Sequence, residues 1–63
     1  MNQEPVVEVT RLPRCQWCLR EAHYDARTRS GRWGYLCGEH FRQHGPGRLG
    51  IGLGHRLVQR EDD

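Results

Sequence analysis

Three cysteines and one histidine stand as two closely spaced pairs in this 63-residue chain. Cys15 and Cys18 are separated by two residues, and so are Cys37 and His40, with eighteen residues between the two pairs. Thiolate and imidazole groups at this C-x2-C, C-x2-H spacing are typical ligands of a tetrahedral zinc ion. We therefore predict that these four side chains bind one structural Zn²⁺, whose closed ligand shell leaves no position for a reacting water.

Other residues near the two pairs leave alternatives open. His23 and His44 also lie near the cysteines in the sequence. His40 is favoured as the fourth ligand because it shares the first turn of an expected helix with Cys37. The first cysteine pair alone is compatible with redox chemistry, but a thioredoxin-like pair requires a βαβ unit, which this chain is too short to build.

The elements that must position the ligands are all short. β-Branched residues at 6–12 predict a strand that ends at Pro13. An alternating pattern predicts two further strands over 22–28 and 33–37. The turn residues between them, at 29–32, indicate that these strands form a β-hairpin. Such a hairpin would return the chain from the first ligand pair to the second.

A helix of about two turns is predicted over residues 38–44, with the second ligand pair at its beginning. Gly45 is expected to end the helix in a left-handed conformation, with Pro46 just beyond it. Five glycines fall within residues 45–54, which predicts a loop or an irregular edge strand. The tail at 55–60 is compatible with a strand or with one helical turn.

The aromatic residues are divided between core and surface. Trp33 and Tyr35 alternate with Cys37 in the second hairpin strand, so all three share a face. We interpret Trp33 and Tyr35 as core residues, as is usual in a small zinc domain. Trp17, in the turn between the first two cysteines, is the better candidate for exposure. The alternative for such side chains is stacking on nucleic-acid bases.

The order of a cysteine turn, a hairpin and a helix that carries the last two ligands resembles the treble-clef zinc finger over residues 14–45. The resemblance implies a small zinc-stabilised α+β fold with a Gly-rich C-terminal segment, and it implies no particular activity. Four segments also look like small zinc-finger proteins encoded by phages and prophages of actinobacteria: Cys15-x2-Cys18, Tyr24-Asp25-Ala26-Arg27-Thr28, Trp33-Gly34-Tyr35-Leu36-Cys37 and Leu49-Gly50-Ile51-Gly52-Leu53-Gly54.

Length and composition limit the remaining possibilities. A chain of 63 residues forms one domain at most, and its core is too thin to hold it without a cross-link. We expect three segments: an N-terminal strand or arm at 1–13, a zinc-binding domain at 14–45, and a Gly-rich segment with an acidic tail at 46–63.

Cysteine use and hydropathy bear on location and activity. Three cysteines cannot all pair with one another, and no leader sequence is recognised, so we expect a reducing cytoplasmic location. No apolar run reaches the ~20 residues that cross a bilayer, which predicts no membrane association. His23, His44 and His55 have no partner at a catalytic spacing, so we predict that the protein is not an enzyme.

The charged residues suggest one class of partner. All ten basic residues are arginines, whose paired N–H groups suit phosphate, but codon bias in a GC-rich genome also explains this usage. The net charge of only +2 is not that of a strongly basic protein. Arg27, Arg29 and Arg32 cluster at the expected hairpin turn, and with Trp17 they are the candidate nucleic-acid contacts. A solvated turn is an equally compatible interpretation.

A second class of partner is a protein. Leu49, Ile51 and Leu53 alternate with glycines in the Gly-rich segment, where they would form an apolar edge. The chain would then be an adaptor that binds another protein or associates with itself through this segment. The two hypotheses differ in their response to salt, because only phosphate contacts weaken steeply with ionic strength.

Overall fold

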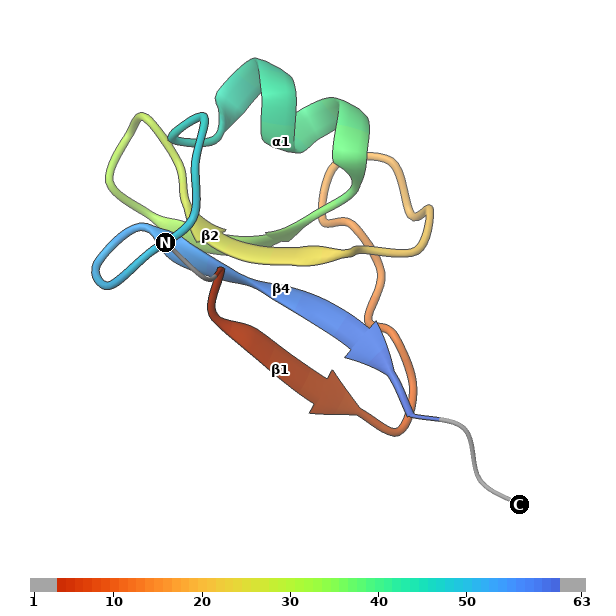
Figure 1. Cartoon of the computed structure of the whole chain (residues 1–63). Helices are drawn as coiled ribbons and strands as arrows, with labels where there is room; N and C mark the ends of the chain where they lie inside the picture. Colours follow the sequence, from red (N-terminus) through yellow and green to blue (C-terminus); the bar gives the residue numbers. More distant parts are fainter. Residues whose placement is uncertain (1–3, 61–63) are drawn as a thin grey trace.

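Residues 4–60 are described by the computed structural model, and they form a four-stranded sheet with one short helix on it (Figure 1). The strands lie side by side in the order β1-β4-β2-β3. The α+β class predicted from the sequence is therefore confirmed. The elements are β1 at Val6–Val9, β2 at Tyr24–Arg27, β3 at Trp33–Leu36, α1 at Gly38–His44 and β4 at Gly54–Gln59.

Strand β4 has a neighbour on each side. It runs parallel to β1, where Val7 lies beside Leu57, and antiparallel to β2, where Asp25 lies beside His55. The tail that the sequence left open between strand and helical turn is therefore an interior strand of the sheet. The Gly-rich segment that precedes it forms the loop between α1 and β4.

Helix α1 packs against β2 and β3 on one face of the sheet. Phe41 of the helix stacks on Tyr24 with the two ring centroids 4.1 Å apart. Ala26 and Leu36 share this face of the hairpin with Tyr24 and are completely buried. The layer between helix and hairpin is therefore the main core.

The interpretation of Trp33 and Tyr35 as core residues was wrong. In the hairpin register Trp33 pairs with Arg27 and Tyr35 pairs with Asp25, and these four side chains point away from the helix. The side chains of Trp33 and Tyr35 are on the surface, with the two residues 50% and 45% exposed. Alternation along a strand determines which residues share a face, but it does not determine which face the helix covers.

Helix α1 begins immediately after β3 and has the predicted bounds. Cys37 is its N-cap residue, and its sulfur accepts a hydrogen bond from the N–H of His40 at 3.5 Å. The left-handed conformation expected for Gly45 was wrong, since its φ of −85° and ψ of −177° are extended. Gly45 is instead needed for space, because a Cβ there would lie 2.5 Å from the carbonyl oxygen of Phe41.

The remaining strands are shorter than the sequence predicted. β1 ends at Val9, because the chain then leaves the sheet toward the first ligand pair. The hairpin turn lies where it was predicted. Thr28 closes it, since both its N–H and its hydroxyl donate to the carbonyl of Arg32 at 2.8 Å.

All three expected segments contribute to the one sheet. β1 comes from residues 1–13, β2 and β3 from 14–45, and β4 from 46–63. The acidic end at 61–63 lies outside the described residues. Over residues 4–60, no helix combines the length and the apolar character needed to cross a membrane.

Candidate metal centre

The first ligand pair lies in a tight turn between β1 and β2. The N–H of Leu19 donates to the carbonyl of Cys15 at 2.9 Å, and the N–H of Cys15 donates to the carbonyl of Arg20 at 2.6 Å. Leu19 has a φ of +64°, in the left-handed region, where the chain reverses direction after Cys18. This turn brings the two sulfurs to the same side of the backbone, within 4.8 Å of each other.

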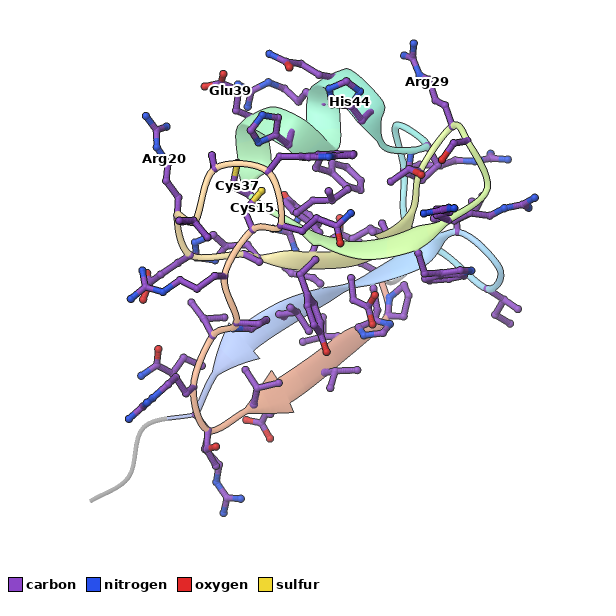
Figure 2. The ribbon with its side chains drawn as sticks, turned by 180° about the vertical axis from the view of Figure 1, so that it is seen from behind. Cys15, Arg20, Arg29, Cys37, Glu39 and His44 are labelled. Carbon is purple, nitrogen blue, oxygen red and sulfur yellow. The ribbon has the colours of Figure 1, made fainter. Side chains whose placement is uncertain are left out.

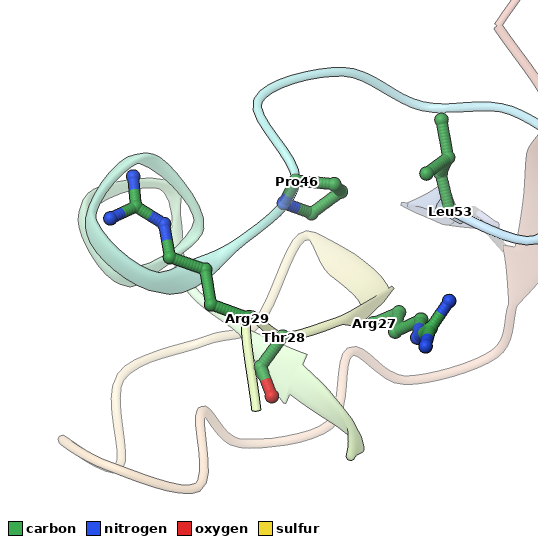
Figure 3. Close-up of a pocket in the computed structure, with 5 residues that line it drawn as sticks. All are labelled: Arg27, Thr28, Arg29, Pro46 and Leu53. Carbon is green, nitrogen blue, oxygen red and sulfur yellow. The ribbon is translucent and has the colours of Figure 1, made fainter. Parts of the chain in front are cut away.

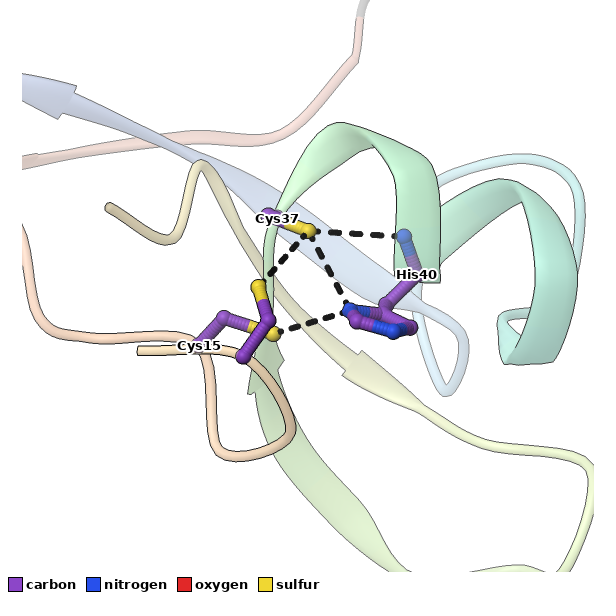
Figure 4. A group of neighbouring side chains, drawn as sticks. Cys15, Cys37 and His40 are labelled. Carbon is purple, nitrogen blue, oxygen red and sulfur yellow. Dashed lines mark hydrogen bonds between the residues drawn. The ribbon is translucent and has the colours of Figure 1, made fainter. Parts of the chain in front are cut away.

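The second ligand pair lies at the junction of β3 and α1. The Sγ atom of Cys37 is 3.6 Å from the Sγ atom of Cys18 and 3.3 Å from Nδ1 of His40. The same Nδ1 atom is 3.4 Å from the Sγ atom of Cys15. All four ligand atoms lie within 4.8 Å of one another, and Figure 4 shows Cys15, Cys37 and His40 converging on one point.

These distances fit one tetrahedral ion. Zinc bonds of about 2.3 Å to sulfur and about 2.0–2.1 Å to nitrogen place neighbouring ligand atoms about 3.8 Å apart for two sulfurs and about 3.6 Å apart for sulfur and nitrogen. The observed separations of 3.6, 3.4 and 3.3 Å are close to those edges. Cys15 and Cys37 are buried, and Cys18 and His40 are half-buried. The four residues therefore lie close enough to bind a metal ion.

The electrostatics around the sulfurs favour a bound cation. Burial raises the pKa of the Cys15 thiol, but backbone N–H groups, first that of Cys37 and then those of Trp17 and Cys18, lower it to about 6 overall. For Cys18 the N–H of Arg20 lowers the pKa, yet burial and the neighbouring sulfurs raise it by more. Adjacent thiols resist being ionised together, and a metal ion removes that repulsion.

Only one of the three histidines near the cysteines has its ring among the sulfurs. The ring of His44 lies outside the group of four and contacts Trp17 at 4.6 Å between centroids. Trp17 also approaches the ring of His40 edge-on at 5.6 Å, so it covers part of the site. His23 is exposed, and its N–H donates to the carbonyl of Leu36. His40 is therefore the histidine placed to bind the ion.

The four residues predicted to contact nucleic acid are exposed, and they come from three parts of the fold. Arg27 ends β2, Arg29 and Arg32 belong to the hairpin turn, and Trp17 lies in the turn of the first ligand pair. The N–H of Arg29 donates to the carbonyl of His44 at 2.9 Å, and the ring of His44 contacts Trp17. Figure 2 shows Arg29 and His44 on the same side of the molecule.

A small cavity of about 190 Å³ opens beside the hairpin turn. In Figure 3 the side chains of Arg27 and Arg29 point in different directions from it, so their guanidinium groups do not converge on one ligand. Leu53 and Pro46 contribute apolar atoms to the wall. The lining residues are Arg27, Thr28, Arg29, Pro46 and Leu53.

Sequence reasoning missed a polar pair on the face of the sheet opposite to helix α1. Nε2 of His55 lies 3.4 Å from the carboxylate of Asp25, across the pairing of β2 with β4. The two residues are far apart in the sequence, and only the sheet topology brings them together. A second, exposed pair, Arg20 and Glu39 at 3.9 Å, lies beside the metal ligands in Figure 2.

Comparison with known proteins assigns no relative: no family model matches the chain, and neither a curated protein nor a solved structure matches it significantly.

Proposed function

We propose that the chain is a structural-zinc module of treble-clef type that binds nucleic acid, as an accessory protein of the phage or prophage kind. The observation that carries the zinc part is the convergence of three sulfurs and one imidazole nitrogen within 4.8 Å. Thiolate and imidazole donors suit Zn²⁺ and are poor ligands for Mg²⁺ or Ca²⁺. Four protein ligands complete the shell, so the ion holds the fold together and takes no part in a reaction.

The nucleic-acid part is supported by the arginines. Arg27, Arg29 and Arg32 are exposed, and within residues 4–60 none of them forms an ion pair with a carboxylate. By contrast, Arg56 and Arg20 each have an acidic neighbour. Guanidinium groups without carboxylate partners remain available to phosphate, which supplies most of the affinity in non-specific nucleic-acid binding.

The test is the salt dependence of binding to a duplex DNA by the zinc-loaded chain. Replacing Arg27, Arg29 and Arg32 together by alanine should weaken binding and flatten the slope of log affinity against log salt by ~2–3 units, because each lost phosphate contact removes about 0.9 unit. Zinc content should stay unchanged, since none of the three is a ligand. If the parent chain binds no nucleic acid even at low salt, the nucleic-acid assignment is wrong.

A protein-binding role is the alternative, and one observation favours it. Ile51 is fully exposed at the tip of the loop before β4, where a partner that covered it would gain the free energy of burying an apolar side chain. Leu49 and Leu53 are only half-exposed, so the apolar edge expected from the sequence is reduced to one side chain. Binding that persists at high salt and is lost in Ile51→Asp would support this alternative.

A further inference from the structure

The sheet has one face that the helix does not cover. Helix α1 packs on the face that carries Tyr24, while Trp33 and Tyr35 of β3 stand on the opposite face. The two residues are 50% and 45% exposed, so about half of each is accessible to a ligand. Two half-exposed rings two residues apart on one strand form an aromatic surface on which a flat, apolar group can pack.

The neighbours of the two rings define the chemistry of this surface. Arg27 lies directly across the hairpin from Trp33, and its guanidinium group has no ion pair within the described chain. Asp25 lies across from Tyr35, but its carboxylate is already next to His55 at 3.4 Å. The face therefore offers two rings and one cation free to bind an anion, while its acidic group has a partner.

The spacing of the rings selects between single and double strands. Side chains two residues apart on a strand are about 6.6–6.8 Å apart, roughly twice the 3.4 Å rise per nucleotide of a stacked strand. Successive bases can reach both rings only if the nucleic acid is unstacked and extended. A duplex hides the faces of its bases, so it cannot use these rings.

We propose that the open face of β2 and β3 binds single-stranded nucleic acid, with Trp33 and Tyr35 stacking on bases and Arg27 contacting a phosphate. This inference rests on the proposed nucleic-acid function and deepens it. It assigns base stacking to Trp33 and Tyr35 in place of Trp17, whose ring already contacts His44. The hairpin turn that joins β2 to β3 carries two further arginines, of which Arg29 lies toward the helix with His44.

The experiment measures binding of the zinc-loaded full chain to a fluorescein-labelled oligothymidylate about twelve nucleotides long and to a duplex of the same length. The single strand should bind more tightly than the duplex at equal salt. Trp33→Ala and Tyr35→Ala should each weaken single-strand binding about 5- to 150-fold, the range measured when a stacking side chain is truncated. Trp33→Phe should retain most of the affinity, and Trp33→Leu should not, because only phenylalanine keeps an aromatic face.

Val6→Ala is the matched control, because Val6 is an exposed apolar residue that the sheet register places with Arg56 and Tyr24 on the other face, so its loss should leave binding unchanged. Zinc content and the far-ultraviolet circular dichroism spectrum establish that each variant is folded. Single-strand binding unchanged in folded Trp33→Ala and Tyr35→Ala overturns this inference, and so does tighter binding to the duplex. In both cases the arginine-dependent function can still hold. Absence of all nucleic-acid binding by the parent overturns the proposed function itself.

Discussion

His40 and His44 lie one helical turn apart, yet their rings have different surroundings. Nδ1 of His40 is 3.3 Å from the sulfur of Cys37 and 3.4 Å from that of Cys15. The ring of His44 instead contacts the ring of Trp17. His40→Ala should therefore unfold the domain or lower its zinc affinity by more than the ~10–100-fold that follows loss of a group that only supports a ligand. Zinc titration against a chromophoric chelator measures this change.

The matched variants are His44→Ala and His23→Ala. His44→Ala removes an aromatic contact of Trp17, so a decrease in zinc affinity of up to about tenfold is expected. His23→Ala should have no effect, because the His23 side chain is exposed and its backbone N–H is retained. If His44→Ala lost as much zinc as His40→Ala, the assignment of His40 as the fourth ligand would be wrong.

Leu19 is the single residue within 4–60, glycine apart, that has a positive φ. It is 72% exposed, so its side chain gains little from packing, while the left-handed backbone costs a residue with a Cβ roughly 1–2 kcal/mol. Leu19→Gly should stabilise the zinc-loaded chain by about 0.5–1 kcal/mol, after the larger unfolded-state entropy of glycine is subtracted. Thermal unfolding at a fixed concentration of free zinc measures the difference.

Ile51→Gly is the control for this substitution. Ile51 is also exposed, but its φ is not positive, so glycine should only add unfolded-state entropy and lower the melting temperature. A Leu19→Gly variant that melts at a lower temperature than the parent would contradict this explanation. It would show that the strain of the left-handed backbone at Leu19 is smaller than the stabilisation that leucine provides at this position.

At the scale of elements, a row of contacts runs from the helix through β2 and β4 to Glu4, which precedes β1. Phe41 of α1 stacks on Tyr24 of β2, and the guanidinium group of Arg56 in β4 lies 5.0 Å from the centre of the Tyr24 ring. Arg56 also donates to the hydroxyl of Tyr24 at 3.1 Å and to both carboxylate oxygens of Glu4 at 2.9 and 3.0 Å. The hydrogen bonds from Arg56 and the nearby positive charge lower the pKa of Glu4 below its ordinary value.

The contact of β2 with β4 depends on Gly54. Its φ of +147° is unfavourable for a residue with a side chain, and a Cβ there would lie 2.7 Å from the Cα and Cβ of Ala26 and from the carbonyl oxygen of Asp25. Gly54→Ala must push the two strands apart, so it should destabilise the domain by about 2 kcal/mol or more. Thermal unfolding of the zinc-loaded variant measures the loss.

Gly38→Ala is the matched control for Gly54→Ala. Gly38 lies in the first turn of α1, and a Cβ there would have no atom within 4 Å. Alanine should therefore be neutral or stabilising by up to about 1 kcal/mol, because it is the better helix former. Equal destabilisation by both substitutions would contradict the steric explanation.

Local patterns in the sequence predicted the helix at 38–44, the hairpin and the four residues that converge. Each of these patterns, a glycine after a helix, alternation along a strand and the spacing of two ligands, extends over only a few residues. The position of β4 was not predictable in this way. Its pairing with β1 and β2 joins distant segments, and the glycine-rich sequence before it suggests only a loop. The exposure of Trp33 likewise depends on which face the helix covers, a tertiary choice that alternation leaves undetermined.

At the scale of the whole molecule, the buried core is too small to hold the chain alone. Leu36 and the candidate ligand Cys15 are the largest fully buried side chains within residues 4–60. Among the described residues, two of the six buried apolar ones are alanines and two are candidate ligands, so metal binding and core formation share two side chains. The six are Cys15, Ala22, Ala26, Leu36, Cys37 and Leu57.

Removal of the metal should therefore unfold the entire chain. Structural zinc contributes ~10–16 kcal/mol to the folding of peptides of this size, which exceeds what so thin a core supplies. A metal ion bound by these four residues would join the turn at Cys15 to the β3–α1 junction, and we expect the sheet to lose its helix layer when that link is broken. We expect elemental analysis to give one zinc per chain.

A strong chelator should abolish the far-ultraviolet circular dichroism of strand and helix together, and added Zn²⁺ should restore it. Mg²⁺ should fail to restore the spectrum, because three of the four ligands are sulfur. A spectrum that survives chelation, or a protein that contains no zinc, would contradict the structural role of the site.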